Sequence, residues 1–116
     1  MIKMNSISGV LLLVSDLDAT AEFYEKLGFR PGDRTDDSFK VYINWFWVEF
    51  IAVVKNKGTG NDTQFVYIAV NDVDEMYEDL KGRGFSPTEP QTYPSKRRET
   101  MISDPDGYKL VFFNKK

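Results

Sequence analysis

The sequence predicts an α+β fold in which two tandem βαβββ modules form a curved mixed sheet around a cavity, with the helices on the outer face. This prediction rests on three observations. A unit of about half the chain is repeated, each copy combines strand-like and helix-like hydrophobic periodicity, and the predicted strands are apolar on both faces.

The repeat is visible as two stretches, VLLLVSDLDATAEFYEKLGFRP and VYIAVNDVDEMYEDLKGRGFSP, which align without a gap. The shared Asp-x-Asp and Gly-Phe-x-Pro spacings make a duplicated unit the simplest explanation. The matched pairs are Val14 and Val70, Asp16 and Asp72, Asp18 and Asp74, Gly28 and Gly84, Phe29 and Phe85, and Pro31 and Pro87.

The first copy begins with a strand at 9–14, and a helix follows. Ser15 or Asp16 can cap this helix, and Gly28 ends it. Apolar residues recur inside it at helical spacing. Three further strands are predicted at about 29–34, 39–44 and 46–54.

The second copy repeats this order, with a strand at 65–70 and a helix that stops at Gly84. Further strands are predicted at about 85–88, 98–103 and 108–114. The segment 87–99 holds three of the prolines and is predicted to be a long, mobile loop that could close over a site. We expect one domain over 1–116, with module one at about 7–54, a Gly-rich linker at 55–62 and module two at about 63–114.

Composition excludes several classes of function. The chain has no Cys and no His, which removes thiol chemistry, the usual general base and the commonest metal ligand. A net charge of −3 without a basic block argues against nucleic-acid binding. The apolar run at 10–14 is too short to span a bilayer, so we expect a cytoplasmic protein without a membrane partner.

Alternation along four predicted strands divides their residues between two faces of the sheet. One face is wholly apolar, as expected beneath the helices. The other is also largely apolar, so the sheet must curve around a cavity, pair with another chain, or do both. Glu49 and Lys109 are the charges on this other face, and they either bridge each other at the rim or contact a ligand. The face comprises Gly9, Leu11, Leu13, Trp47, Glu49, Ile51, Phe65, Tyr67, Ala69, Lys109, Val111 and Phe113.

The motifs VSDLDATAEFYEKLGF, VNDVDEMYEDLKGRGF and DPDGYKLVFF, within two βαβββ units, resemble the vicinal oxygen chelate superfamily, which has the glyoxalase and bleomycin-resistance fold. In the metal enzymes of that family, four strand positions supply the ligands. The resemblance places those positions here on Gly9, Glu49, Phe65 and Val111. Because only Glu49 can coordinate an ion, we expect no metal and no other cofactor.

The resemblance is greatest to the metal-free, bleomycin-resistance-like branch, whose members are homodimers that sequester a cationic, ring-bearing antibiotic without altering it. It implies a homodimer that binds a hydrophobic or cationic aromatic small molecule and confers antibiotic resistance. The acidic balance of the chain and its aromatic residues suit such a ligand. The predicted ligand-binding residues are Trp45, Trp47, Glu49, Phe65, Tyr67, Lys109, Val111 and Phe113.

Two alternatives remain open. The chain could be a superfamily enzyme, of lyase, isomerase or dioxygenase type, in which Glu49 is the sole acid/base, assisted by Lys109 or Tyr67. It could also be a dimerisation module without a ligand, with Trp45 and Phe46 as interface anchors. A binding protein is the first choice because most of the family's metal positions are apolar.

Overall fold

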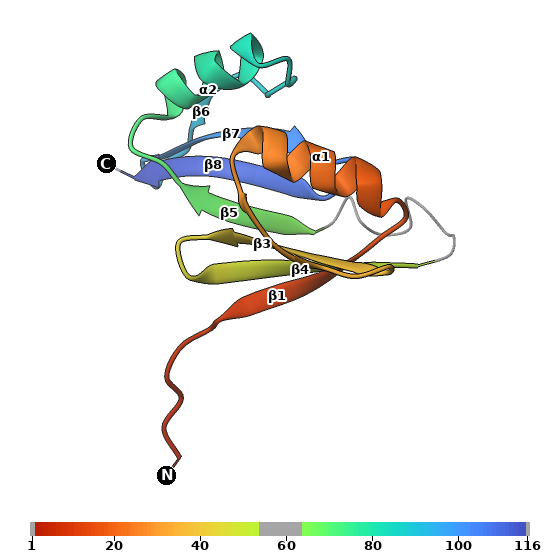
Figure 1. Ribbon diagram of the computed structural model, residues 1–116. Coiled ribbons are helices and arrows are strands. Elements are labelled where there is room, and N and C mark those ends of the chain that lie inside the picture. Colours follow the sequence, from red (N-terminus) through yellow and green to blue (C-terminus); the bar gives the residue numbers. More distant parts are fainter. Residues whose placement is uncertain (1, 54–63, 116) are drawn as a thin grey trace. The chain divides into compact units, whose positions relative to one another are not determined.

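The computed structural model describes residues 2–53 and 64–115 (Figure 1). The chain divides into two compact units, Met1–Lys57 and Gly58–Lys116, and each is described by itself. Each unit carries one helix and one mixed four-stranded sheet in the order βαβββ. The predicted α+β class with two tandem modules is therefore confirmed, while the predicted linker at 55–62 lies outside the described residues.

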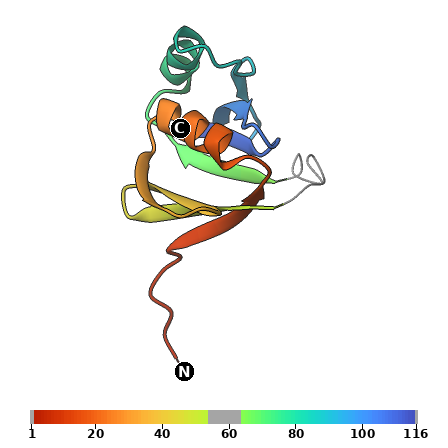
Figure 2. The ribbon, with the colours of Figure 1, turned by 45° about the vertical axis from the view of Figure 1, so that its right-hand side comes forward.

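The sheet of the first unit has the strand order β1-β4-β3-β2. β1 runs parallel to β4, and the other neighbours are antiparallel. Residues 2–8, which precede β1, extend away from that strand in both views (Figures 1 and 2). The elements are β1 (Gly9–Val14), α1 (Leu17–Leu27), β2 (Arg30–Arg34), β3 (Ser38–Ile43) and β4 (Phe46–Ala52).

The sheet of the second unit repeats this topology, with the order β5-β8-β7-β6. β5 runs parallel to β8, and the remaining pairs are antiparallel. The elements are β5 (Phe65–Ala69), α2 (Val73–Gly82), β6 (Gln91–Thr92), β7 (Arg97–Ser103) and β8 (Lys109–Lys115).

Both helices begin at an equivalent aspartate. Asp16 accepts a hydrogen bond from the backbone N–H of Ala19, and Asp72 accepts one from that of Glu75, each at 3.1 Å. The side-chain oxygen thereby satisfies a backbone donor that has no partner inside the helix. Of the two predicted caps of the first helix, the structure selects Asp16. Gly28 ends α1 in the left-handed region at φ 117°, where glycine has no steric penalty.

Each helix covers one face of its own sheet. In the first unit the ring of Tyr24 lies 4.7 Å from that of Phe50 and 5.3 Å from that of Phe29, between ring centroids. In the second unit Leu80 of α2 is buried, as are Thr100 and Phe112 of the sheet. Alternate strand residues thus form the core beneath each helix, as the periodicity predicts.

The predicted strand at 85–88 is wrong. The N–H of Phe85 is bonded instead to the carbonyl of Leu80 at the end of α2, so this segment closes the helix. The third element of the second unit is the short strand β6, which pairs with β7 around a turn at 93–96. Thr88 also bonds to Met101 of β7, so part of the predicted mobile loop at 87–99 is held against the sheet.

The DPDG motif forms the turn that leads into β8. Asp104 Oδ1 accepts hydrogen bonds from the backbone N–H groups of Asp106 and Tyr108, at 2.9 and 3.0 Å. Gly107 adopts φ 95°, a conformation that favours glycine. The turn fixes the register of β8 and hence the face to which Val111 belongs. Across the described ranges, neither helix is long and apolar enough to cross a membrane.

Candidate functional site

The face of each sheet opposite its helix is called the second face here. In the first unit its side chains form three rows across the strands, set by the pairing register. The first row is Arg30, Tyr42, Trp47 and Gly9, the next is Lys40, Glu49 and Leu11, and the last is Ser38, Ile51 and Leu13.

The indole of Trp47 occupies the space beside Gly9. A Cβ atom at Gly9 would lie 2.2 Å from Cδ2 of Trp47 and 2.4 Å from its carbonyl oxygen, well inside van der Waals contact. The ammonium of Lys40 lies 4.6 Å from the centroid of the same indole, a cation–π distance. Gly9 is therefore required by the packing of its neighbour and offers no opening for another group.

Glu49 lies half-buried in the middle row, opposite Leu11 on one side and Lys40 on the other. Among the described residues, its carboxylate forms no hydrogen bond and no ion pair, because the ammonium of Lys40 lies against Trp47. This carboxylate is partly desolvated, because Leu11 and Lys40 flank it in the row and Trp47 precedes it on the same face of β4. Such a carboxylate can attract a cationic group.

The second unit has equivalent rows with different side chains. Lys109 donates a hydrogen bond to Ser103 Oγ at 3.0 Å, so this amine has a neutral partner inside the sheet. Val111 is only 1% exposed, whereas Phe65 and Tyr67 on the edge strand are about half exposed, at 51% and 49%. The rows are Phe65, Lys109 and Ser103; Tyr67, Val111 and Met101; and Ala69, Phe113, Glu99 and Gln91.

Arg97 lies on the second face between two tyrosine rings. Its Cζ is 5.5 Å from the ring centroid of Tyr67 and 5.6 Å from that of Tyr93. Its Nε donates to Oε1 of Glu99 at 3.0 Å. A pocket of ≈ 300 Å³ adjoins this group and is lined by Thr88, Glu89, Gln91, Tyr93, Glu99 and Met101.

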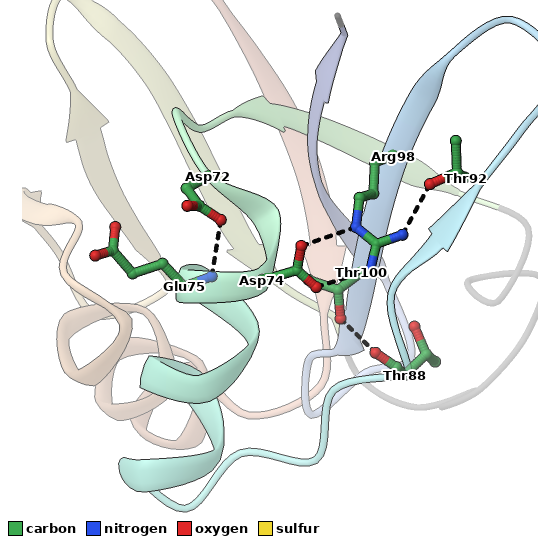
Figure 3. A network of polar contacts seen from close by, with 7 residues as sticks. All are labelled: Asp72, Asp74, Glu75, Thr88, Thr92, Arg98 and Thr100. Carbon is green, nitrogen blue, oxygen red and sulfur yellow. Dashed lines mark hydrogen bonds and ion pairs between the residues drawn. The ribbon is translucent and has the colours of Figure 1, made fainter.

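A polar network holds α2 to the helix-facing side of the same sheet (Figure 3). Arg98 donates to both carboxylate oxygens of Asp74, at 3.0 and 2.7 Å, and to Thr92 at 2.8 Å. The hydrogen bond from Arg98 lowers the pKa of the Asp74 carboxyl below its ordinary value, and the same pair raises the pKa of Arg98. Thr100 donates to the carbonyl of Thr88 at 2.5 Å. This network is structural and anchors β6 and β7.

Most predicted ligand-binding residues lie on the second face, as alternation predicts, but they belong to different units. Trp45 does not lie there. It occupies the turn between β3 and β4, is 63% exposed, and its ring contacts that of Phe46 edge-on. The second-face residues are Trp47 and Glu49 in the first unit, and Phe65, Tyr67, Lys109, Val111 and Phe113 in the second. Their ligand roles remain predictions.

Sequence reasoning missed several polar residues on the second face. Lys40 and Tyr42 alternate with buried Phe39 and Val41, so the same alternation applied to β3 could have placed them. The Arg97 group was missed because part of it fell within the predicted loop at 87–99. The missed residues are Lys40, Tyr42, Tyr93, Arg97 and Glu99.

The four positions that the family resemblance assigns to a metal do not fit one. Gly9 has no side chain and its space is filled by Trp47, while Phe65 and Val111 have no donor atoms. Glu49 alone offers oxygen ligands, and a transition metal needs three or more protein ligands in such sites. Across the described part of the chain, no three carboxylate side chains converge in a way that could hold an ion.

Comparisons with known proteins agree with this fold. No curated protein matches the chain. A glyoxalase/bleomycin resistance protein/dioxygenase from Nocardioides has 22% identity and a TM-score of 0.82, with 97% of this chain and 85% of that chain covered. The bleomycin resistance determinant encoded on transposon Tn5 has 22% identity and a TM-score of 0.81, covering 97% and 99%. A bleomycin-binding protein solved with bleomycin has 21% identity and a TM-score of 0.79, covering 97% and 100%.

At these identities the solved structures establish the fold alone. Family membership rests on sequence, because the profile of one superfamily matches residues 6–112. That match spans both βαβββ units and the motifs that carried the resemblance. The chain belongs to the glyoxalase/bleomycin resistance protein/dioxygenase superfamily.

Proposed function

We propose that this chain is a metal-free binding protein that holds a hydrophobic or cationic aromatic small molecule on its second faces. The observation that carries the proposal is the exposure of large apolar side chains there. Leu11, Leu13, Phe65 and Tyr67 are each 48–51% exposed, whereas Val14, Val48, Leu110 and Phe112 on the helix-facing sides are at most 5% exposed. Leu11 and Leu13 belong to the first unit and Phe65 and Tyr67 to the second, so each second face carries a pair of exposed apolar side chains, as is typical of ligand or protein contacts.

Charge favours a cationic ligand. Glu49 supplies an open carboxylate near Trp47, and the chain carries a net charge of −3. A planar ring with a positive charge can stack on an aromatic side chain and approach this carboxylate at the same time. Two similar structures are described as a bleomycin resistance determinant and a bleomycin-binding protein, so a cationic aromatic antibiotic is the ligand class we infer.

A homodimer is part of the same proposal. β1 is an edge strand of its sheet, and its exposed Leu11 and Leu13 could be buried against a second copy. Sedimentation analysis should give a mass twice that of the chain, and substitution of both leucines by serine should give a monomer.

The ligand proposal is tested by titrating bleomycin and other planar cationic compounds into a Trp45→Phe variant. Trp47 is then the single indole, so its quenching reports on the second face of the first unit. Binding should also raise the melting temperature by mass action. Absence of both quenching and thermal stabilisation across the compound set would refute the proposal.

One observation favours an enzyme as the second candidate. Because the Glu49 carboxylate has no partner among the described residues, it is free to take a proton from a carbon next to a carbonyl. Glu49→Gln should then abolish turnover while substrate still binds. If turnover is unchanged by this substitution, Glu49 is not the base.

A further inference from the structure

The guanidinium of Arg97 is surrounded by the groups that bind organic cations in proteins: two aromatic rings and a carboxylate. We propose that Tyr67, Tyr93 and Glu99, called the cation cage here, form a binding site for the planar amidinium or guanidinium group of a ligand. Arg97 occupies this site as an internal cation that the ligand displaces. The inference deepens the proposed function and rests on it in one respect, that the ligand is a cation.

The cage is open enough to exchange its occupant. Tyr67 is 49% exposed and Tyr93 is 38% exposed, so both rings can be reached from solvent. The side chain of Glu99 is only 14% exposed, so its charge is partly desolvated and attracts a cation more strongly than a surface carboxylate does.

The side chain of Arg97 is held by fewer hydrogen bonds than that of Arg98, the next residue along β7. Arg98 makes two hydrogen bonds to Asp74 and one to Thr92. Within residues 2–53 and 64–115, Arg97 makes one ion-pair contact, through Nε, and its side chain is 37% exposed. The contact at Nε leaves the two terminal nitrogens of this guanidinium without a hydrogen bond among the described residues, whereas a bidentate pair such as that of Arg98 fixes both the position and the orientation of the side chain. Arg97 can therefore leave the cage without disturbing the sheet.

The adjoining pocket can receive the rest of the ligand. Its volume of ≈ 300 Å³ is at the lower end of the range for small-molecule sites. No basic residue lines it among those the structure describes, and Tyr93 and Met101 offer apolar surface beside the carboxylates of Glu89 and Glu99. A cation in the cage would thus have a place for an attached aromatic body.

Benzamidine, a planar amidinium on one aromatic ring, is the probe, and benzyl alcohol is the uncharged control. With methyl-labelled methionine, Met101 reports on the pocket and Met76 of α2 reports on a part of the unit outside it. Benzamidine should shift the Met101 signal and leave that of Met76 unchanged. Benzyl alcohol should bind at least about tenfold more weakly, because it lacks the charge that the cage recognises.

Two substitutions with opposite outcomes decide the proposal. Arg97→Gln removes the internal cation and should tighten benzamidine binding about tenfold, whereas Glu99→Gln should weaken it by about the same factor. Lys81→Gln on α2 removes the same charge elsewhere in the unit and should change binding less than about twofold. Tyr93→Leu tests the cage without changing any charge and should also weaken binding.

The cage is ruled out if Arg97→Gln leaves affinity unchanged or lowers it, or if Lys81→Gln tightens binding equally. If planar cations quench Trp47 but never shift Met101, the proposed function stands and the cage is wrong. If no planar cation binds anywhere on the protein, the proposed function fails as well.

Discussion

The two units have the same element order and the same strand pairing, yet their second faces differ in chemistry. β1 pairs Gly9 with Trp47, and β5 pairs Phe65 with Lys109. The same register then makes Glu49 the counterpart of Val111. The first unit keeps a carboxylate without a partner among the described residues, whereas the second has a buried valine there.

The duplicated backbone therefore determines where a side chain lies but not what it does. In the second unit the carboxylate of the second face is on a different strand, as Glu99 of β7, and it is paired with Arg97. Each unit therefore offers one acidic group beside aromatic rings, but only that of the first unit lacks an internal cationic partner among the described residues.

Placing a carboxylate at Val111, the counterpart of Glu49 in the second unit, should have the largest effect on stability. Val111 lies between Tyr67 and Met101 in the register and is 1% exposed, so Val111→Glu would bury a charge without a partner. We expect a loss of about 3–5 kcal/mol in the free energy of unfolding, measured by urea denaturation. Burial raises the pKa of such a carboxyl, so the loss should increase as pH rises through the ordinary glutamate range. A loss below about 1 kcal/mol would mean that the position is solvated.

Adding a side chain at Gly9, the first residue of β1, should destabilise the fold less than Val111→Glu does. Gly9→Ala places a methyl group within 2.4 Å of both the ring and the carbonyl oxygen of Trp47, so the strands must shift. We expect a destabilisation of about 1–3 kcal/mol, typical of overpacking. The matched control is Phe65→Leu at the equivalent place of the second unit, where the side chain is half exposed and the change should be small. Equal effects at both positions would contradict the close packing of Trp47 on Gly9.

Removing the carboxylate from the first unit should have a smaller effect, of opposite sign. Glu49→Val gives the first unit the residue of the second and replaces a half-buried charge, which has no partner among the residues the structure describes, with an apolar side chain. We expect stability to be unchanged or to rise by up to about 1 kcal/mol in urea denaturation, because no hydrogen bond is lost. Lys40→Met is the control for the opposite charge in the same row. A clear loss of stability in Glu49→Val would indicate a structural role for the carboxylate.

The features that depend on the course of the backbone could be predicted from the sequence. The aspartate at each helix start, the glycine after α1 and the alternation that places Glu49 opposite the helix are local or periodic signals. Contacts between side chains that lie far apart in the sequence could not be predicted in this way. Nothing in the pattern indicates that the ring of Trp47 fills the space at Gly9, or that Arg97 lies between Tyr67 and Tyr93. The short strand β6 was missed because prolines on both sides of it favoured a loop.

The smallest expected effect on stability comes from an ion pair between helix and sheet. Each unit forms such a pair, with an equivalent aspartate but with an arginine from a different place in the unit. Asp18 of α1 pairs with Arg34 of β2 through one contact of 2.6 Å, while Asp74 of α2 accepts two hydrogen bonds from Arg98 of β7. The bond from Arg98 lowers the pKa of Asp74 in the folded state. Asp74 therefore stabilises the fold above the ordinary aspartate pKa of about 3.9, and this contribution is lost as pH falls through the lower folded-state pKa.

Arg98→Gln should raise the titration midpoint of the Asp74 carboxyl, measured by carbon NMR, because the hydrogen bonds that favour its charged form are lost. Stability at neutral pH should hardly change, because the side chain of Asp74 is 62% exposed and such pairs contribute little there. Arg34→Gln is the matched substitution in the first unit and should leave the Asp74 midpoint where it is. An unchanged Asp74 midpoint in Arg98→Gln would mean that the paired hydrogen bonds do not persist in solution. The second unit would then have no firmer link between helix and sheet than the first.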